Sequence, residues 1–138
     1  MFIIEKLLFG LTFLGTFFAF LIGGWHISLT ILVAFMVIDI VTGLIKAAIQ
    51  KKLNSKVSYR GFLKKTSIML VIIIANLLDV LTASGVPVFR TMAVFFYIGM
   101  EGLSIVENLG HIGIPLPSGI TKYIEQLSKE EIPTNGKE

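Results

Sequence analysis

The 138-residue chain is 54% hydrophobic and only 15% charged, with a mean hydropathy of +0.85, which excludes an ordinary water-soluble domain. The absence of cysteine excludes disulfides, thiolate nucleophiles and Cys-ligated metal sites. The net charge of +3 accompanies this membrane-like composition, so we expect the basic residues to face anionic lipid headgroups and not nucleic acid.

Four apolar stretches predict an all-α integral membrane protein with four transmembrane helices. They cover residues 7–23, 27–45, 66–83 and 91–108, and each is close to the roughly 17 to 25 residues that cross a bilayer as a helix. We expect two antiparallel hairpins in a transmembrane domain of residues 1–110. Residues 111–138 then supply a breaker-rich linker, a short amphipathic helix and a polar tail.

The first stretch is predicted to be a retained helix and not a cleaved signal peptide. Glu5 cancels the charge of Lys6, and no small-x-small cleavage pattern follows the apolar run. Because glycines at the end of this run allow a tight reversal, we expect a hairpin with the second stretch. Three small residues four positions apart define one face for close helix packing, either within a subunit or between subunits: Gly15, Ala19 and Gly23.

The second stretch carries a carboxylate, Asp39, with Gly43 and Ala47 on the same helix face. An ionised carboxylate in the middle of a bilayer costs roughly 2.5 to 3.5 kcal/mol on insertion scales, so Asp39 should not face lipid. Two interpretations stay open. In the first, the carboxylate has a functional role inside an assembly. In the second, its role is structural, and it reaches either Lys46, two turns along the helix, or interfacial water.

The connector between the second and third stretches, residues 46–65, holds seven of the twelve Lys and Arg residues and no acid. Such an excess stays in the cytoplasm, so both termini are predicted to be cytoplasmic and Arg90 is the one basic residue expected outside. We expect the connector to set the topology and to bind lipid headgroups through Lys46, Lys51, Lys52, Lys56, Arg60, Lys64 and Lys65.

Polar residues within the third and fourth stretches are candidates for pore lining or for contacts between subunits. Asn76 is deep in the third stretch and needs a partner on another helix, whereas Asp79 is expected at the outer interface. The fourth stretch carries a polar stripe that either pairs inside a bundle or lines a lumen formed by several subunits: Tyr97, Glu101, Ser104 and Asn108, with Glu107 beside it. The alternative for this stretch is an amphipathic helix on the membrane surface.

No enzyme constellation is present in the sequence. His26 and His111 lie far apart, and there is no Gly-rich phosphate loop and no nucleophile elbow. We therefore expect a protein that is not an enzyme and that needs neither a cofactor nor a metal.

Several motifs resemble the bacteriophage holin family of the toxin-secretion and phage-lysis type, found in Gram-positive phages and clostridial loci. The resemblance covers roughly residues 27–128. It rests on Asp39-x-x-x-Gly43 with Ala47 and Ala48, on Ser55, Ser58, Gly61, Lys64 and Lys65, and on Glu101-Gly-Leu-Ser104-Ile-Val-Glu107-Asn108 followed by Gly113-Ile-Pro115-Leu-Pro117.

The resemblance implies a multi-pass protein of the bacterial cytoplasmic membrane that assembles with itself into a lesion. A cell-wall hydrolase, the endolysin, leaves through this lesion, or a toxin is exported. The expected partners are thus the lipid bilayer, further copies of the chain and an endolysin or toxin. Two other interpretations are a small ion or solute transporter that uses intramembrane carboxylates, and a non-conducting scaffold that recruits a partner through its C-terminal helix.

Overall fold

A computed structural model describes residues 1–129, which form five α-helices. These are α1 (Phe2–Ile22), α2 (Ile27–Ile49), α3 (Ser55–Thr82), α4 (Val88–Ile112) and α5 (Ser118–Ser128). The first four are long and apolar enough to cross a membrane, which confirms the all-α class with four candidate spans. The part of the predicted polar tail at residues 130–138 lies outside the described residues.

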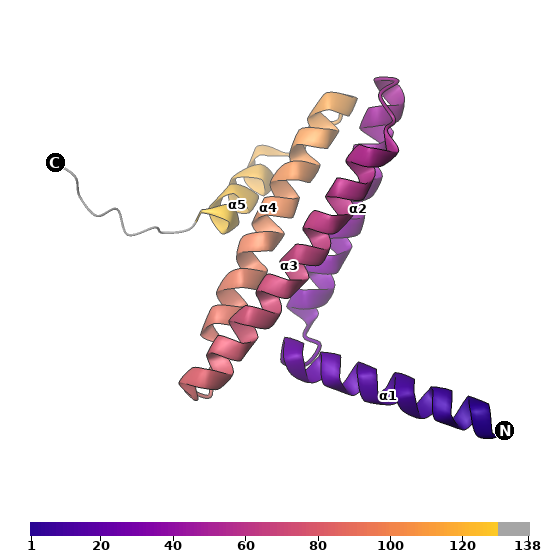
Figure 1. The fold of residues 1–138 in the computed structure, drawn as a ribbon. Coiled ribbons are helices and arrows are strands. Elements are labelled where there is room, and N and C mark those ends of the chain that lie inside the picture. Colours follow the sequence, from indigo (N-terminus) through magenta and orange to yellow (C-terminus); the bar gives the residue numbers. More distant parts are fainter. Residues whose placement is uncertain (130–138) are drawn as a thin grey trace.

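A three-helix bundle of α2, α3 and α4 forms the body of the structure (Figure 1). α2 and α4 run in the same direction. α3, which connects the end of α2 to the start of α4, runs in the opposite direction. The principal packing is between α2 and α4, with α3 against α4 and a smaller contact between α2 and α3. The loop at residues 50–54, within the connector, therefore lies at the same end of the bundle as the C-terminal end of α4.

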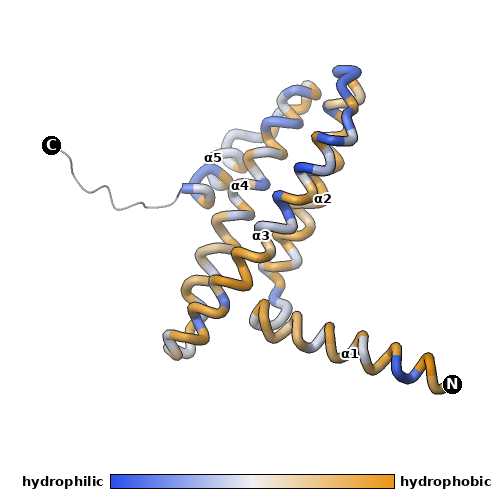
Figure 2. Tube along the Cα trace, viewed as in Figure 1, coloured by the Kyte–Doolittle hydropathy of each residue, from blue (hydrophilic) through white to orange (hydrophobic). Residues whose placement is uncertain are grey.

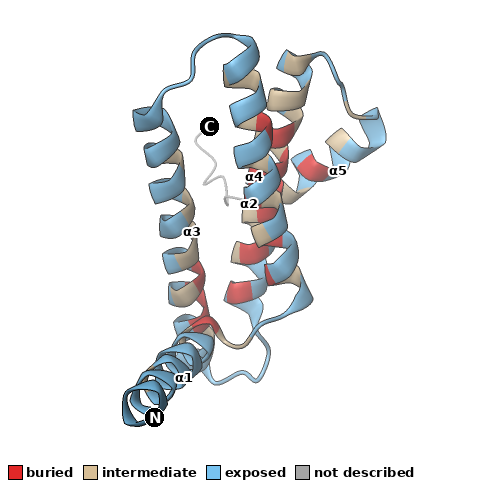
Figure 3. Ribbon diagram, turned by 90° about the vertical axis from the view of Figure 1, so that its right-hand side faces the viewer, coloured by how far each residue is buried: buried red, intermediate tan, exposed pale blue. Residues whose placement is uncertain are grey.

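The first helix diverges from this bundle, and nearly its whole length is exposed (Figures 1 and 3). It contacts α3 at its C-terminal end and, among the described residues, does not pack on α2. The predicted hairpin of the first two helices is therefore not formed. A helix that is apolar on all sides and unpacked in water would be unstable, so the surroundings that suit α1 are lipid or other apolar helices.

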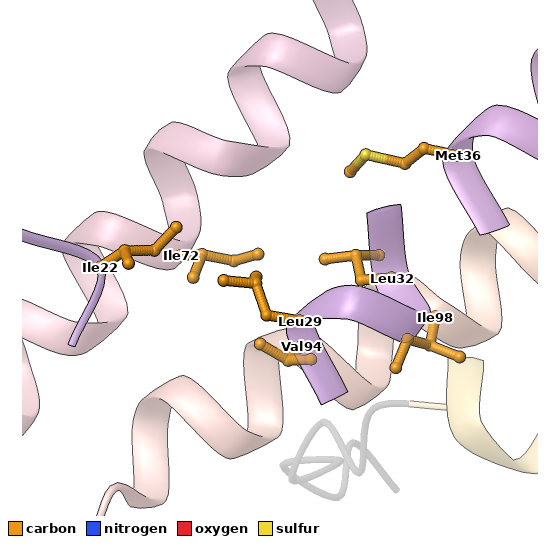
Figure 4. Packing of buried hydrophobic residues seen from close by; sticks show 7 residues of the cluster. All are labelled: Ile22, Leu29, Leu32, Met36, Ile72, Val94 and Ile98. Atoms are coloured by element: carbon orange, nitrogen blue, oxygen red, sulfur yellow. The ribbon is translucent and has the colours of Figure 1, made fainter. Parts of the chain in front are cut away.

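A hydrophobic core occupies the half of the bundle next to α1. Leu29, Leu32 and Met36 of α2 meet Ile72 of α3 and the α4 pair Val94 and Ile98, and Ile22 joins them from the end of α1 (Figure 4). The α2 residues recur at spacings of three and four, which places them on one helix face. This packing fixes the register of the three helices and thereby the height of every polar residue at the other end.

The opposite half of the bundle is more polar (Figure 2). Here α3 begins at Ser55, well before the apolar stretch that was predicted to start at residue 66. Asn54 makes this start possible, because its side chain accepts a hydrogen bond from the Lys56 backbone N–H at 2.9 Å. The predicted 46–65 loop is thus largely helical, with Lys56, Arg60, Lys64 and Lys65 on the first turns of α3.

The amphipathic helix α5 folds back along α4 and buries Ile124 there. Two glycines of α4 allow the close approach. A Cβ at Gly99 would overlap the Ser128 backbone nitrogen, and a Cβ at Gly102 would lie 2.7 Å from Ile124 Cγ2. Gly99 and Gly102 therefore act as the docking surface for α5.

Candidate functional site

A lysine of α3 joins two carboxylates from the other helices of the bundle. Lys65 Nζ lies 2.7 Å from Asp39 Oδ2 of α2 and 2.6 Å from Glu101 Oε2 of α4. The side chains are only 13%, 15% and 8% exposed for Lys65, Asp39 and Glu101, respectively. Hydrogen bonds between charged groups are strong and directional, so this bridge couples all three helices at one level.

Asn108, two turns beyond Glu101 on α4, extends the bridge toward the end of the bundle. Its Nδ2 donates to Asp39 Oδ1 at 3.0 Å and to Thr42 Oγ1 at 3.1 Å. Gly43 of α2 faces this amide, and a Cβ there would stand in ordinary van der Waals contact, 3.6 Å from Asn108 Nδ2. Asp39, Thr42, Lys65, Glu101 and Asn108 form what we call the polar cluster.

An open groove of about 310 Å³ gives access to the polar cluster from the connector end. Ser104 and the exposed Glu107 line it from α4, while Lys46 and Lys52 line it from α2 and the connector. The cluster carries two carboxylates and one ammonium, and the two groove lysines supply compensating positive charge nearby. Water and small ions can therefore reach charges that lie between the helices of a single subunit.

The energetic balance of the cluster argues against a purely stabilising role. Removing charges from water costs several kcal/mol per ion, and well-packed apolar residues often stabilise a bundle equally well. The bridge adds a specific contact among α2, α3 and α4 in the register that the hydrophobic core sets. Every buried side-chain N or O in the described part of the chain has a hydrogen-bond partner, so the arrangement is complete as it stands.

A second polar junction, at the opposite end of the bundle, holds the end of α1. Asn76 Nδ2 donates to the carbonyl of Leu21 at 2.8 Å, and Arg90 donates to the carbonyls of Gly23 at 2.8 Å and Gly24 at 2.6 Å. The Leu21 carbonyl is one of those that a helix C-terminus leaves unpaired, and Gly23 and Gly24 follow the end of α1 directly. The junction thus attaches α1 to α3 and α4 through backbone groups.

Asp79 of α3 completes this junction by binding the N-terminal backbone of α4, whose N-cap residue is Pro87. Its two carboxylate oxygens accept hydrogen bonds from the backbone N–H groups of Phe89 and Arg90, both at 2.9 Å. Asp79 and Arg90 are both engaged in contacts within the subunit, and Arg90 is only 5% exposed. Their contacts bind the third and fourth helices to each other and to α1.

The predicted polar residues divide among three places. Asp39, Glu101 and Asn108 come together in the polar cluster, Ser104 and Glu107 line its groove, and Asn76 lies at the α1 junction. Tyr97 lies in none of these three places. It packs edge-on to Phe96 with ring centroids 5.2 Å apart and lines a different groove, beside α3.

The structure differs from the sequence-based expectation at Lys65, which was expected at lipid headgroups with the other connector residues and is the central cation of the bridge. Lys46, one of the partners left open for Asp39, lines the groove. The position of Lys65 in the sequence could have indicated this role. It is the last basic residue before the apolar part of α3, where a charge has the greatest need of a buried partner.

The small residues also differ in their surroundings. A Cβ at Gly15 would meet no atom within 4 Å, whereas a Cβ at Gly23 would overlap the Asn76 side chain. Ala19 is exposed and Ala47 lines the groove.

Within residues 1–129, no group of three or more His, Asp or Glu side chains is placed to hold a metal ion.

Comparison with known proteins places the chain among phage-related membrane proteins. The family model described as the bacteriophage holin family matches residues 16–129. The chain is similar to an uncharacterised 14.9 kDa protein in the nagH 3' region of Clostridium perfringens, 38% identical over 94% of this chain and 98% of the relative. It is also similar to a probable holin of Bacillus phage phi105, 40% identical over 74% of this chain and 75% of the phage protein.

A further relative, the uncharacterised protein YqxH of Bacillus subtilis, is 42% identical over 75% of this chain and 73% of its own length. No solved structure matches the chain.

Proposed function

Because this chain belongs to the bacteriophage holin family, we propose that this multi-pass membrane protein assembles in the cytoplasmic membrane into a lesion. A cell-wall hydrolase passes through this lesion to lyse the host, or a toxin is exported through it. The similarity to a probable phage holin supports the proposal. The protein contributes the opening and leaves catalysis to its partner.

The connector 46–65 faces the cytoplasm in this proposal, with both termini on the same side. Eleven of the twelve basic residues then lie inside and Arg90 lies outside, in agreement with the positive-inside tendency. The polar half of the bundle, with the groove and α5, faces the cytoplasm. The hydrophobic core and the α1 junction lie toward the outer leaflet.

The observation that carries the proposal is the polar cluster enclosed between α2, α3 and α4. A folded hydrolase of 150 residues has a radius of gyration of about 15 Å, so a groove of about 310 Å³ in one subunit cannot admit it. The opening must be built between subunits. In the assembled lesion, the polar halves of α2 and α4 at the connector end turn toward water, which suits Asp39, Glu101, Ser104, Glu107 and Asn108.

The exposed first helix supplies an apolar surface for self-association. Except at its C-terminal end, it offers apolar side chains to the surroundings; a Cβ at Gly15 would meet no atom within 4 Å, and Ala19 is exposed. Two copies can approach closely at such positions. Assembly through α1 leaves the bundles free to rearrange around a central opening.

Induced expression in a bacterial host tests the proposal. We expect growth to stop and the membrane potential to collapse abruptly after a delay, because a lesion forms only when enough subunits have accumulated. A co-expressed hydrolase without a signal peptide should appear in the medium at the same moment. Gradual leakage at every expression level, without release of the hydrolase, would contradict the proposal.

A second candidate function, a small ion pathway, is favoured by one observation: the groove leads from the connector end to Asp39 and Lys65. Carboxylates within a membrane often mark routes for protons or cations. This candidate predicts saturable ion flux in reconstituted vesicles that Glu101→Gln abolishes, with no passage of a protein cargo. Under the lesion proposal, the same substitution changes the time of triggering.

A further inference from the structure

We propose that a groove between α3 and α4 binds one anionic phospholipid, whose phosphate is held by Arg60 and Lys64 while an acyl chain lies along α3. This groove, of about 470 Å³, is separate from the polar cluster. Its wall is formed by the apolar side chains Leu63, Ile68 and Val71, and Tyr97 bounds it from α4. We call it the lipid groove.

The arrangement of the lipid groove follows the amphipathic shape of a phospholipid. Arg60 and Lys64 lie one turn apart on α3, nearest the connector, with Leu63 between them. Beyond Lys64 the lining continues along the helix through Ser67 to Ile68 and Val71. Arg60 and Val71 are separated by a rise of about 17 Å at about 1.5 Å per residue. That length is close to half of the roughly 30 Å hydrocarbon core, so a chain with its phosphate at Arg60 would end near the bilayer centre.

The charges around the lipid groove favour an anionic headgroup. No acidic residue lines it, and within residues 1–129 neither Arg60 nor Lys64 forms an ion pair. The polar groove on the other side of α3 differs, because Asp39 and Glu107 lie among its lysines. Two cations one turn apart bind a phosphate through several hydrogen bonds, and basic residues at the cytoplasmic surface attract anionic lipids.

The wall of the lipid groove accounts for the choice of a lipid over a free anion. Leu63 is 45% exposed and Val71 is 38% exposed, although both face a concave surface. A free phosphate would leave this apolar wall uncovered, whereas an acyl chain covers it. The occupant that satisfies both ends of the groove is an anionic phospholipid such as phosphatidylglycerol.

Native mass spectrometry of the full-length protein in mild detergent, titrated with phosphatidylglycerol or phosphatidylcholine, tests the proposal. We expect one tightly retained phosphatidylglycerol and weaker retention of phosphatidylcholine. The double variant Arg60→Gln/Lys64→Gln should bind phosphatidylglycerol roughly tenfold more weakly, because both headgroup contacts are lost. The matched variant Lys51→Gln/Lys56→Gln removes the same charge outside the groove and should change binding less than twofold.

A groove-filling variant separates the acyl chain from the charges. Val71→Trp keeps both cations but occupies the wall, so it should also weaken phosphatidylglycerol binding; Leu63→Trp replaces it if Val71→Trp does not fold. Equal losses in the two glutamine variants would overturn the proposal in favour of a general basic surface. Unchanged binding in the tryptophan variant, or displacement of the lipid by millimolar inorganic phosphate, would also overturn it. Lipid retention is measured without lesion formation, so the proposed function stands or falls separately.

Discussion

Replacing Lys65 by methionine is expected to lower the free energy of unfolding by about 3 kcal/mol. The substitution leaves Asp39 and Glu101 facing each other between α2 and α4 without the cation that bridges them at 2.7 and 2.6 Å. Removing one partner from a buried ion bridge is costly, because the remaining charges are neither paired nor fully hydrated. The measurement is denaturant or thermal unfolding of the purified protein in detergent, followed by helical circular dichroism.

Lys56→Met is the matched control, because Lys56 lies on the same helix with an exposed side chain. It should change the unfolding free energy by less than about 0.5 kcal/mol. The triple variant Asp39→Leu/Lys65→Met/Glu101→Leu should regain stability, since an apolar set replaces the whole ion bridge. It should nevertheless fail to lyse cells. Normal lysis by this stable variant would mean that the cluster serves folding alone.

Replacing Gly23 by alanine is expected to detach α1 from the bundle. Gly23 has φ +81°, a backbone conformation that costs alanine about 1 to 2 kcal/mol. The added Cβ would also overlap the Asn76 amide that donates to the carbonyls of Phe20 and Leu21. Pulsed electron paramagnetic resonance between spin labels at Thr12→Cys and Ser67→Cys should show one broad distance distribution in place of a narrow one.

Gly15→Ala is the control for this substitution, since a Cβ at Gly15 meets nothing within 4 Å and its backbone is helical. The control should keep the narrow distribution, and its stability should rise slightly because alanine favours a helix. An unchanged distribution in Gly23→Ala would show that the junction formed by Asn76 and Arg90 does not fix the direction of α1.

The sequence was sufficient for the helices but not for their arrangement. Apolar runs of spanning length identified four long helices, and α5 followed from its amphipathic period. The direction of α1 was not predictable, because a short glycine link permits a hairpin but does not require one. The direction of α1 depends on hydrogen bonds from residues more than fifty positions away in the chain. Asn76 donates to the Leu21 carbonyl, and Arg90 donates to the carbonyls of Gly23 and Gly24.

The sequence singled out three members of the polar cluster, Asp39, Glu101 and Asn108, but neither Thr42 nor the pairing with Lys65. Spacing on α4 placed Glu101, Ser104 and Asn108 on one face, and burial identified Asp39 as a residue in need of a partner. The partner was missed because Lys65 was counted with a flexible connector. Its role depends on α3 starting at Ser55 and on the register that the distant hydrophobic core imposes.

A disulfide between α2 and α4 tests most directly whether the lesion requires these two helices to separate. The chain has no cysteine, and a Cβ at position 43 would lie 3.6 Å from Asn108 Nδ2, so Gly43→Cys/Asn108→Cys places two thiols across the helix contact. The protein is reconstituted into vesicles that enclose a labelled hydrolase, and release is followed after oxidation and again after reduction.

We predict that oxidised vesicles of the double variant retain the hydrolase and release it once the disulfide is reduced. The single variant Asn108→Cys, which lacks one amide of the polar cluster, sets the reference rate, and each single-cysteine variant should release the hydrolase at the same rate before and after reduction. Release from fully oxidised vesicles at the rate of the reduced ones would contradict the account, because the lesion would then form while α2 and α4 stay together and the polar cluster stays closed.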